Sequence, residues 1–123
     1  MATTLTPVTF PTDQFTGGVR GGSWTLANGE SGAALFLPPF SDKTVQVGGT
    51  FGVGGSVTIE GSLDGTNYIA LTDPQGNALT KTAAAIEAVS EAVPYVRPRV
   101  TAGDGTTAIT VLIFALNRGG FNV

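Results

Sequence analysis

The sequence has no cysteine and no histidine, and it carries little charge. Without cysteine the chain has no disulfide and no thiolate to act as a nucleophile or metal ligand. Without histidine it lacks the commonest general base and the commonest transition-metal ligand. Only 12% of the 123 residues are charged, against about 25% in an average globular domain. This scarcity excludes a strongly charged disordered tail.

Basic residues and long apolar runs are also scarce. Six Lys and Arg stand against nine Asp and Glu, which gives a formal net charge of −3. That balance argues against a nucleic-acid binder, because phosphate contacts need clustered cations. No apolar run approaches the roughly 18 residues of a membrane span, and MATTLTPVTF at the N-terminus does not have the pattern of a signal peptide. We therefore expect neither a nucleic-acid partner nor a membrane partner.

Glycine and apolar residues, by contrast, are abundant. Eighteen Gly and seven Pro occur in a chain that is 41% hydrophobic, a composition typical of short strands separated by turns. The length suits one domain with a single two-layer core. We expect an all-β fold, an antiparallel β-sandwich or jelly roll over residues 31–123, preceded by an irregular Gly/Thr/Pro-rich arm over residues 1–30.

The arm is expected to lack strands, because Gly17, Gly18, Gly21 and Gly22 would break them. Two interpretations stay open: coil packed on the domain, or a segment that becomes ordered against a neighbouring subunit. Ordering costs roughly 1–2 kcal/mol per residue, so such an arm must bury apolar groups. The candidates for that burial are Val8, Phe10, Phe15, Val19 and Trp24.

The firmest local prediction is a β-hairpin over residues 56–72. Val57 and Ile59 alternate with polar residues, which is the two-residue period of a strand with one buried face. Asp64 and Gly65 then supply a tight-turn signal, because glycine adopts the positive φ that such turns need.

Three further segments are assigned from composition and periodicity, and the first of them is ambiguous. Residues 81–92 are rich in alanine, which favours a helix, but like charges four residues apart oppose one. We expect an extended segment, with a single helical turn as the alternative.

Residues 95–101 alternate between apolar and polar side chains, and Pro98 predicts an edge strand or a bulge because it cannot donate a ladder hydrogen bond. Residues 106–116 are apolar on both faces and need cover on both, from the arm or another chain.

One strand face carries a composition typical of protein interfaces. Tyr95, Arg97 and Arg99 should point the same way along their strand, and aromatic residues and arginines are enriched where proteins meet. The alternative is a stacked surface stripe paired with Glu60 or Glu87. The single tryptophan is either a core residue or an anchor into a partner. The predicted interface residues are Trp24, Phe36, Phe40, Tyr95, Arg97, Arg99 and Phe121.

Carboxylates give only weak indications of chemistry. Glu60, Asp64 and Asp73 lie near one hairpin, and a carboxylate pair can hydrolyse glycosides, but Asp64 and Asp73 precede Gly and Pro, as turn residues do. Asp64, Asn67, Asp73 and Asp104 offer oxygen ligands for calcium, yet their spacing matches no calcium loop. We expect no enzyme activity, no catalytic residue, no metal and no cofactor.

Two stretches of the chain resemble small structural proteins of tailed-bacteriophage virions: VTIEGSLDGTNYIALTDPQGNALT and PYVRPRVTAGDGTTAITVLIF. In that group a GS-x-DG-x-x-aromatic hairpin precedes a Y-x-R-P strand, a GDGTT turn and a final apolar strand. The likeness covers residues 45–116. It implies a head decoration, or cement, protein that binds the major capsid protein on the capsid exterior of a virion assembled in the host cytoplasm. We expect a homodimer or homotrimer.

The hairpin is also similar to discoidin-type carbohydrate-binding modules, which carry a GS-x-DG-x-x-W strand and a YVR strand in a jelly roll. This chain departs from them, with Tyr68 in place of tryptophan, no cysteine pair and a shorter length. A carbohydrate-binding module, or a tail or head-fibre component of the virion, is therefore the alternative function.

Overall fold

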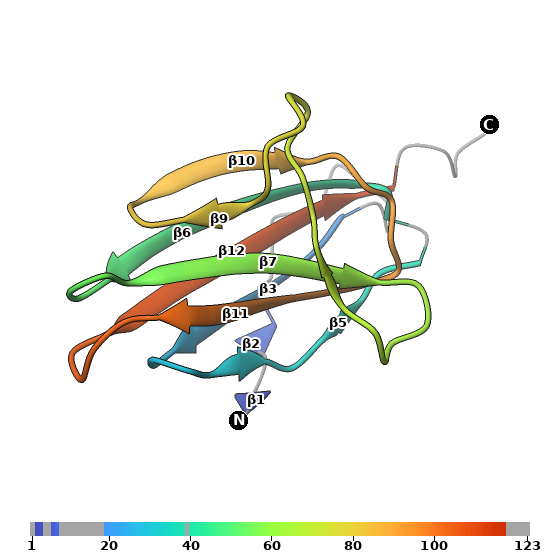
Figure 1. Ribbon diagram of the computed structural model, residues 1–123. Coiled ribbons are helices and arrows are strands. Elements are labelled where there is room, and N and C mark those ends of the chain that lie inside the picture. Colours follow the sequence, from blue (N-terminus) through green and yellow to red (C-terminus); the bar gives the residue numbers. More distant parts are fainter. Residues whose placement is uncertain (1, 4–5, 8–18, 39, 118–123) are drawn as a thin grey trace.

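The computed structural model describes residues 2–3, 6–7, 19–38 and 40–117, which form two β-sheets packed face to face (Figure 1). This arrangement confirms the predicted all-β sandwich, while the narrower jelly-roll topology stays a prediction. None of the described segments is helical, so none has the length and hydropathy of a membrane-spanning helix.

The front layer in Figure 1 is a seven-stranded sheet in which β11 lies between β7 and the short strands β4 and β5. Its pairs are antiparallel except for β1 with β4, which are parallel. Its strands are β1 (Ala2–Thr3), β4 (Ser31–Gly32), β5 (Leu35–Phe36), β7 (Ser56–Ser62), β8 (Ile69–Ala70), β9 (Thr80–Lys81) and β11 (Tyr95–Ala102).

The rear layer is a five-stranded antiparallel sheet in the order β10-β6-β12-β3-β2. Its strands are β2 (Thr6–Pro7), β3 (Val19–Leu26), β6 (Asp42–Thr50), β10 (Ala85–Val89) and β12 (Ala108–Leu116). The extended conformation expected within residues 81–92 is therefore confirmed by β10. The hairpin expected over residues 56–72 is confirmed by the antiparallel pairing of β7 with β8.

The core lies between the two sheets and follows the two-residue period of their strands. Ile109, Val111 and Ile113 of β12 face inward and are at most 1% exposed. Val57 and Ile59 of β7 meet them from the other sheet and are as fully buried. On the outer face of β12, Leu112 is 37% exposed; that another chain or the arm covers this face stays a prediction.

The prediction that glycines would break any strand before residue 30 was wrong. β3 pairs with β12 along its whole length, from Val19 opposite Leu116 to Leu26 opposite Ile109. Gly21 lies opposite Phe114 within that ladder. Glycine weakens a strand through its conformational freedom and missing side chain, but the continuous pairing with β12 outweighs that cost. Of the arm residues that were expected to be buried, three lie outside the described residues: Val8, Phe10 and Phe15.

Of the two alternatives predicted from Pro98, the edge strand was wrong, whereas β11 does carry a register shift, two residues further on between Val100 and Ala102. β11 has neighbours on both sides, with Pro98 opposite Ile59 on β7. Val100 N donates to Glu30 O at 2.9 Å on the other side, so by the two-residue period the nitrogen of Pro98 faces that side too. There β4 ends at Gly32 and β5 begins only at Leu35. The missing donor therefore faces the interruption between two short strands.

Candidate functional site

Four of the predicted interface residues lie together on the outer face of the seven-stranded sheet. Tyr95 is opposite Phe36 of β5 on one side and opposite Ser62 of β7 on the other. Arg97 and Arg99 follow it along β11 and point the same way. We call this surface the aromatic–arginine stripe; its members are Phe36, Glu60, Tyr68, Tyr95, Arg97 and Arg99.

Glu60 holds the two arginines of the stripe in place. Arg97 Nε donates to Glu60 Oε1 at 3.1 Å, and Arg99 Nε donates to Oε2 at 3.0 Å. The Glu60 side chain is 7% exposed, whereas those of Arg97 and Arg99 are 29% and 48% exposed. Two positive charges and one negative charge give the trio a net charge of +1. The arrangement orients two partly exposed guanidinium groups around a buried carboxylate.

This geometry decides between the carboxylates that the sequence offered as partners. Arg97 is directly opposite Glu60 in the register of β11 with β7. Glu87 instead lies on β10, in the other sheet, and accepts a hydrogen bond from Lys81 Nζ at 2.9 Å. The arginines therefore pair with Glu60, and this pairing leaves open whether a partner protein covers them.

The aromatic members of the stripe are packed against protein groups. The guanidinium carbon of Arg97 lies 3.9 Å from the centre of the Tyr68 ring, a cation–π contact. The ring centres of Phe36 and Tyr95 are 4.8 Å apart. Burial raises the pKa of Tyr68 despite the opposing charge of Arg97, so its hydroxyl is neutral at physiological pH.

The turn after β7 also rests on the stripe. Gly65 has a φ of +78°, and a Cβ built there would lie 3.0 Å from Tyr95 Cζ. Glycine thus serves both the positive φ of the turn and its close approach to the ring. The sequence reasoning missed Tyr68 and Gly65 as members or supports of this surface. The aromatic position of the GS-x-DG-x-x-aromatic pattern was the available signal for Tyr68.

The other predicted interface residues lie elsewhere. Trp24 is 2% exposed in the core, and its Nε1 donates to Ala33 O at 2.8 Å. Of its two interpretations, the core residue is therefore right, and its assignment to an interface is corrected. Phe40 is partly buried and packs against the core. Phe121 lies outside the described residues.

The carboxylates considered for calcium or catalysis organise their own turns. Asp64 Oδ1 accepts from Ser62 Oγ at 2.8 Å and from Thr66 N at 2.8 Å, and Asn67 Nδ2 donates to Oδ2 at 2.8 Å. Hydrogen bonds from the backbone N–H groups of Asn67 and Thr66 hold the pKa of Asp64 far below its ordinary value. Within the described part of the chain, no three acidic side chains form a group that could hold a metal ion.

Asp104 ties two loops at one end of the sandwich. Its carboxylate accepts from Val53 N at 2.9 Å and from Thr106 N at 2.8 Å. These hydrogen bonds, led by that from Val53, lower its pKa to about 2. The carboxylate therefore stays ionised and joins the loop after β6 to the loop after β11.

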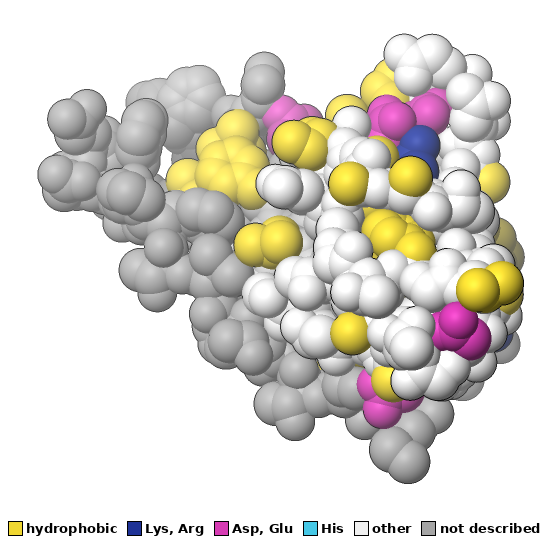
Figure 2. Space-filling model, turned by 90° about the vertical axis from the view of Figure 1, so that its left-hand side faces the viewer, with side chains coloured by type: hydrophobic (Ala, Val, Ile, Leu, Met, Phe, Trp, Pro, Cys, Tyr) yellow, Lys and Arg dark blue, Asp and Glu magenta, His cyan; other side chains and the backbone are white. Residues whose placement is uncertain are grey.

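Among the residues that the structure describes, that end of the sandwich shows no extended patch of one kind. Figure 2 views it directly, and the hydrophobic side chains appear in separate groups among uncharged atoms, with few charged residues between them. Val53, in the loop after β6, is the most exposed of the large hydrophobic residues there at 82%. The stripe, where arginines and aromatic rings touch, is the more organised surface.

No protein-family model matches the sequence, and a search of curated proteins gives no match.

Proposed function

We propose that this protein is a non-enzymatic structural protein of a tailed-bacteriophage virion, of the capsid decoration type. In this proposal it binds the major capsid protein on the capsid exterior as a homodimer or homotrimer, and the aromatic–arginine stripe is the contact surface. The proposal takes its virion setting from the sequence resemblance. It takes its contact surface from the stripe.

The observation that carries the contact surface is the Arg97–Glu60–Arg99 trio. Binding energy is usually concentrated in a few aromatic residues and arginines, and both are present here. Glu60 fixes the two guanidinium groups before any partner arrives, and preorganised groups lose less conformational entropy on binding. Phe36, 48% exposed, adds an apolar surface at the end of the same row.

A surface of this kind suits a protein that acts by repeated weak contact. Each copy that bridges capsid subunits adds contact free energy against the outward pressure of packaged DNA. A single stripe is small, but many copies on one lattice add their contributions. The low charge of the chain, 12% of its residues, limits long-range repulsion between neighbouring copies.

The test is a double substitution, Arg97→Ala with Arg99→Ala, assayed by occupancy on purified particles that lack the protein. We expect occupancy to fall at least tenfold, on the order of the 1.4 kcal/mol that each factor of ten represents, while the circular dichroism spectrum is unchanged. Lys81→Ala is the matched control, because it removes a surface cation paired with Glu87 outside the stripe. Unchanged occupancy of the double variant would refute the role of the stripe.

The carbohydrate-binding alternative has less support from the same rings. A sugar that stacks on an aromatic residue needs an open ring face. Here Arg97 lies over the Tyr68 ring, and the Tyr95 ring contacts Phe36 and the turn at Gly65. Saturable binding of the isolated domain to a glycan array would favour this alternative over capsid decoration.

A further inference from the structure

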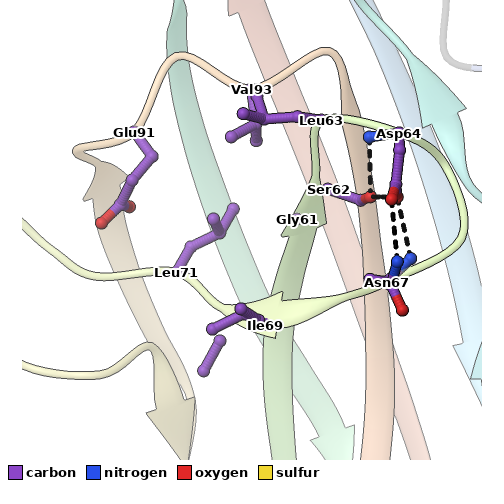
Figure 3. Close-up of a pocket in the computed structure, with 10 residues that line it drawn as sticks. Gly61, Ser62, Leu63, Asp64, Asn67, Ile69, Leu71, Glu91 and Val93 are labelled. Atoms are coloured by element: carbon purple, nitrogen blue, oxygen red, sulfur yellow. Dashed lines mark hydrogen bonds between the residues drawn. The ribbon is translucent and has the colours of Figure 1, made fainter.

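A groove lies near the end of β7, between β8 and the segment that leads into β11 (Figure 3). Its volume is about 380 Å³, within the ~300–1,000 Å³ typical of binding pockets. Gly61 and Ile69 of the groove pair with each other, one residue along from the pair of Glu60 with Ala70, so these two residues face the opposite side of the sheet from Glu60. We call it the Glu91 groove; its main lining residues are Leu63, Asp64, Ile69, Leu71, Glu91 and Val93.

The middle of the groove is apolar and partly open to solvent. Leu63 and Ile69 are 77% and 74% exposed, whereas Leu71 is 4% exposed and belongs to the core. A Cβ at Gly61 would lie 2.6 Å from side-chain carbons of both Leu71 and Val93. The glycine therefore allows these two side chains to pack closely against β7, and they form an apolar floor beside two exposed apolar side chains.

Every charged residue that lines the groove is acidic. Figure 3 shows Glu91 on one side of the apolar side chains and the Asp64 turn on the other; the lining contains no Lys or Arg. Thr72 N donates to Glu91 Oε1 at 2.8 Å, and Thr72 Oγ1 donates to Oε2 at 2.5 Å. These contacts orient the Glu91 carboxylate.

Glu91 is ionised at neutral pH. Burial acts to raise its pKa, but the hydrogen bonds from Thr72 and the charge of Lys43 together lower the pKa below its ordinary value. Lys43 does not line the groove: it is 3% exposed and its Nζ donates to Ser41 O at 3.2 Å. The groove thus joins an apolar floor to a fixed carboxylate.

We propose that the Glu91 groove binds a lysine or arginine side chain presented by a partner protein. The methylene stem of such a residue would lie on Leu71, Ile69 and Val93, and its cation would meet Glu91. Lys and Arg bury their stems on apolar surface while the charged head stays at a polar edge. The groove offers an apolar floor for the stem and a carboxylate at its edge for the head. The inference goes beyond the proposed function and does not depend on the stripe.

The partner is a different protein and not a second copy of this chain. The chain is acidic, with six Lys and Arg against nine Asp and Glu, so two copies repel one another at long range. Lys43 is buried, and Lys81 pairs with Glu87. A basic surface on another protein is therefore the better source of the cation that this groove fits.

The experiment uses small probes of matched length on the full chain: n-butylammonium, n-butylguanidinium, 1-butanol and butyrate. Binding is followed by NMR through the methyl groups of Ile69, Leu71 and Val93. We expect saturable shifts for the two cations, with a Kd on the order of millimolar for ligands of this size. Butanol should bind at least threefold more weakly, and butyrate should bind least. Comparison of the two cations shows whether the groove favours the ammonium or the guanidinium group.

Four variants make the test specific. Glu91→Gln should weaken the cations threefold to tenfold and leave butanol unchanged, while the same change at Glu87, which lies on β10 outside the groove, should leave all four probes unchanged. Ile69→Ala removes an exposed side chain and should weaken every probe without unfolding the protein. Equal binding of butanol and butylammonium to the natural protein, or no shift of the three methyl groups with any probe, would overturn the proposal even if Glu91→Gln failed to fold. Arg97→Ala with Arg99→Ala should still bind the cations, which separates this result from the test of the stripe.

Discussion

The two faces of the β7–β11 pair share one backbone and yet use opposite chemistry. On the inner face, Ile59, Val96 and Val100 are each 1% exposed and contact other apolar side chains. On the outer face, one residue away on each strand, Glu60 joins Arg97 and Arg99. The inner face contributes through the apolar area that it removes from water. The outer face contributes through specific pairs of oppositely charged side chains.

The magnitudes show what each face contributes. Burying a Val or Ile side chain stabilises a fold by roughly 1.5–3 kcal/mol. An ion pair with a partly exposed partner contributes about 0–1 kcal/mol, and both arginines here are partly exposed. The inner face therefore supplies most of the stability. The outer face can vary with little loss of stability, which is the condition under which a surface can serve binding.

The largest effect is expected for Trp24→Ala. This change empties a core position that is 2% exposed and leaves Ala33 O without the indole donor, so the free energy of unfolding should fall by about 3–5 kcal/mol. Urea denaturation measures it. Phe36→Ala, on the outer face, is the matched aromatic control and should cost about 1 kcal/mol or less, because Phe36 is 48% exposed. Similar losses for the two variants would contradict the contrast between the faces.

Gly32→Ala tests how closely the inner face is packed. A Cβ at this position would lie 2.5 Å from Trp24 Cδ1 and 2.9 Å from Pro98 Cδ, so the unfolding free energy should fall by about 1–3 kcal/mol through overpacking. Gly48→Ala is the control, because a Cβ there meets nothing within 4 Å; it should change stability by about 0.5 kcal/mol or less. If Gly32→Ala left the free energy of unfolding unchanged, the core around Trp24 would be able to rearrange to accept the added methyl group.

Glu60→Gln tests the outer face. The change leaves two guanidinium groups beside a neutral amide, and we expect the unfolding free energy to fall by about 1–2 kcal/mol. That is less than the ~3–5 kcal/mol typical of a fully buried pair, because the arginines reach solvent. Glu87→Gln removes a single pair, whose carboxylate side chain is 31% exposed against 7% for Glu60, and should cost about 0.5 kcal/mol or less. Thermal unfolding of both variants at low and high salt measures the difference; a larger loss for Glu87→Gln would be inconsistent with Glu60 as the organising group.

The strands whose side chains alternate could be predicted from the sequence. Val57 and Ile59 show the two-residue period plainly, and the structure buries both. β3 could not be found in this way, because Gly21 and Gly22 have no side chains to show a period. Its strand conformation depends on pairing with β12, a contact between segments far apart in the sequence.

The stripe could be predicted only in part, for a related reason. That Arg97 and Arg99 share a face follows from strand geometry alone. Which carboxylate they meet depends on the register between β11 and β7, which places Arg97 opposite Glu60. The placement of Trp24 was open as well, because a large amphipathic ring suits a core or an interface equally. The structure places the side chain in the core, because it is 2% exposed and its Nε1 donates to Ala33 O.

The smallest expected effect is on the pH dependence of stability. It comes from a carboxylate in the loops and not from either face of the β7–β11 pair. Asp104 has a pKa of about 2 in the folded protein against an ordinary value of 3.8. Between these values the unfolded chain binds more protons than the folded one. The contribution of Asp104 to stability is therefore fully present above about pH 4 and is lost as the pH falls towards 2. Asp64 contributes in the same direction, so Asp104→Asn should remove only part of the slope of the melting temperature between pH 4 and pH 2. Ile59→Val changes the inner face without altering a titratable group; it should lower the melting temperature at every pH and keep the natural slope. If Asp104→Asn kept that slope as well, the bond from Asp104 to Val53 N would not be what holds the two loops together.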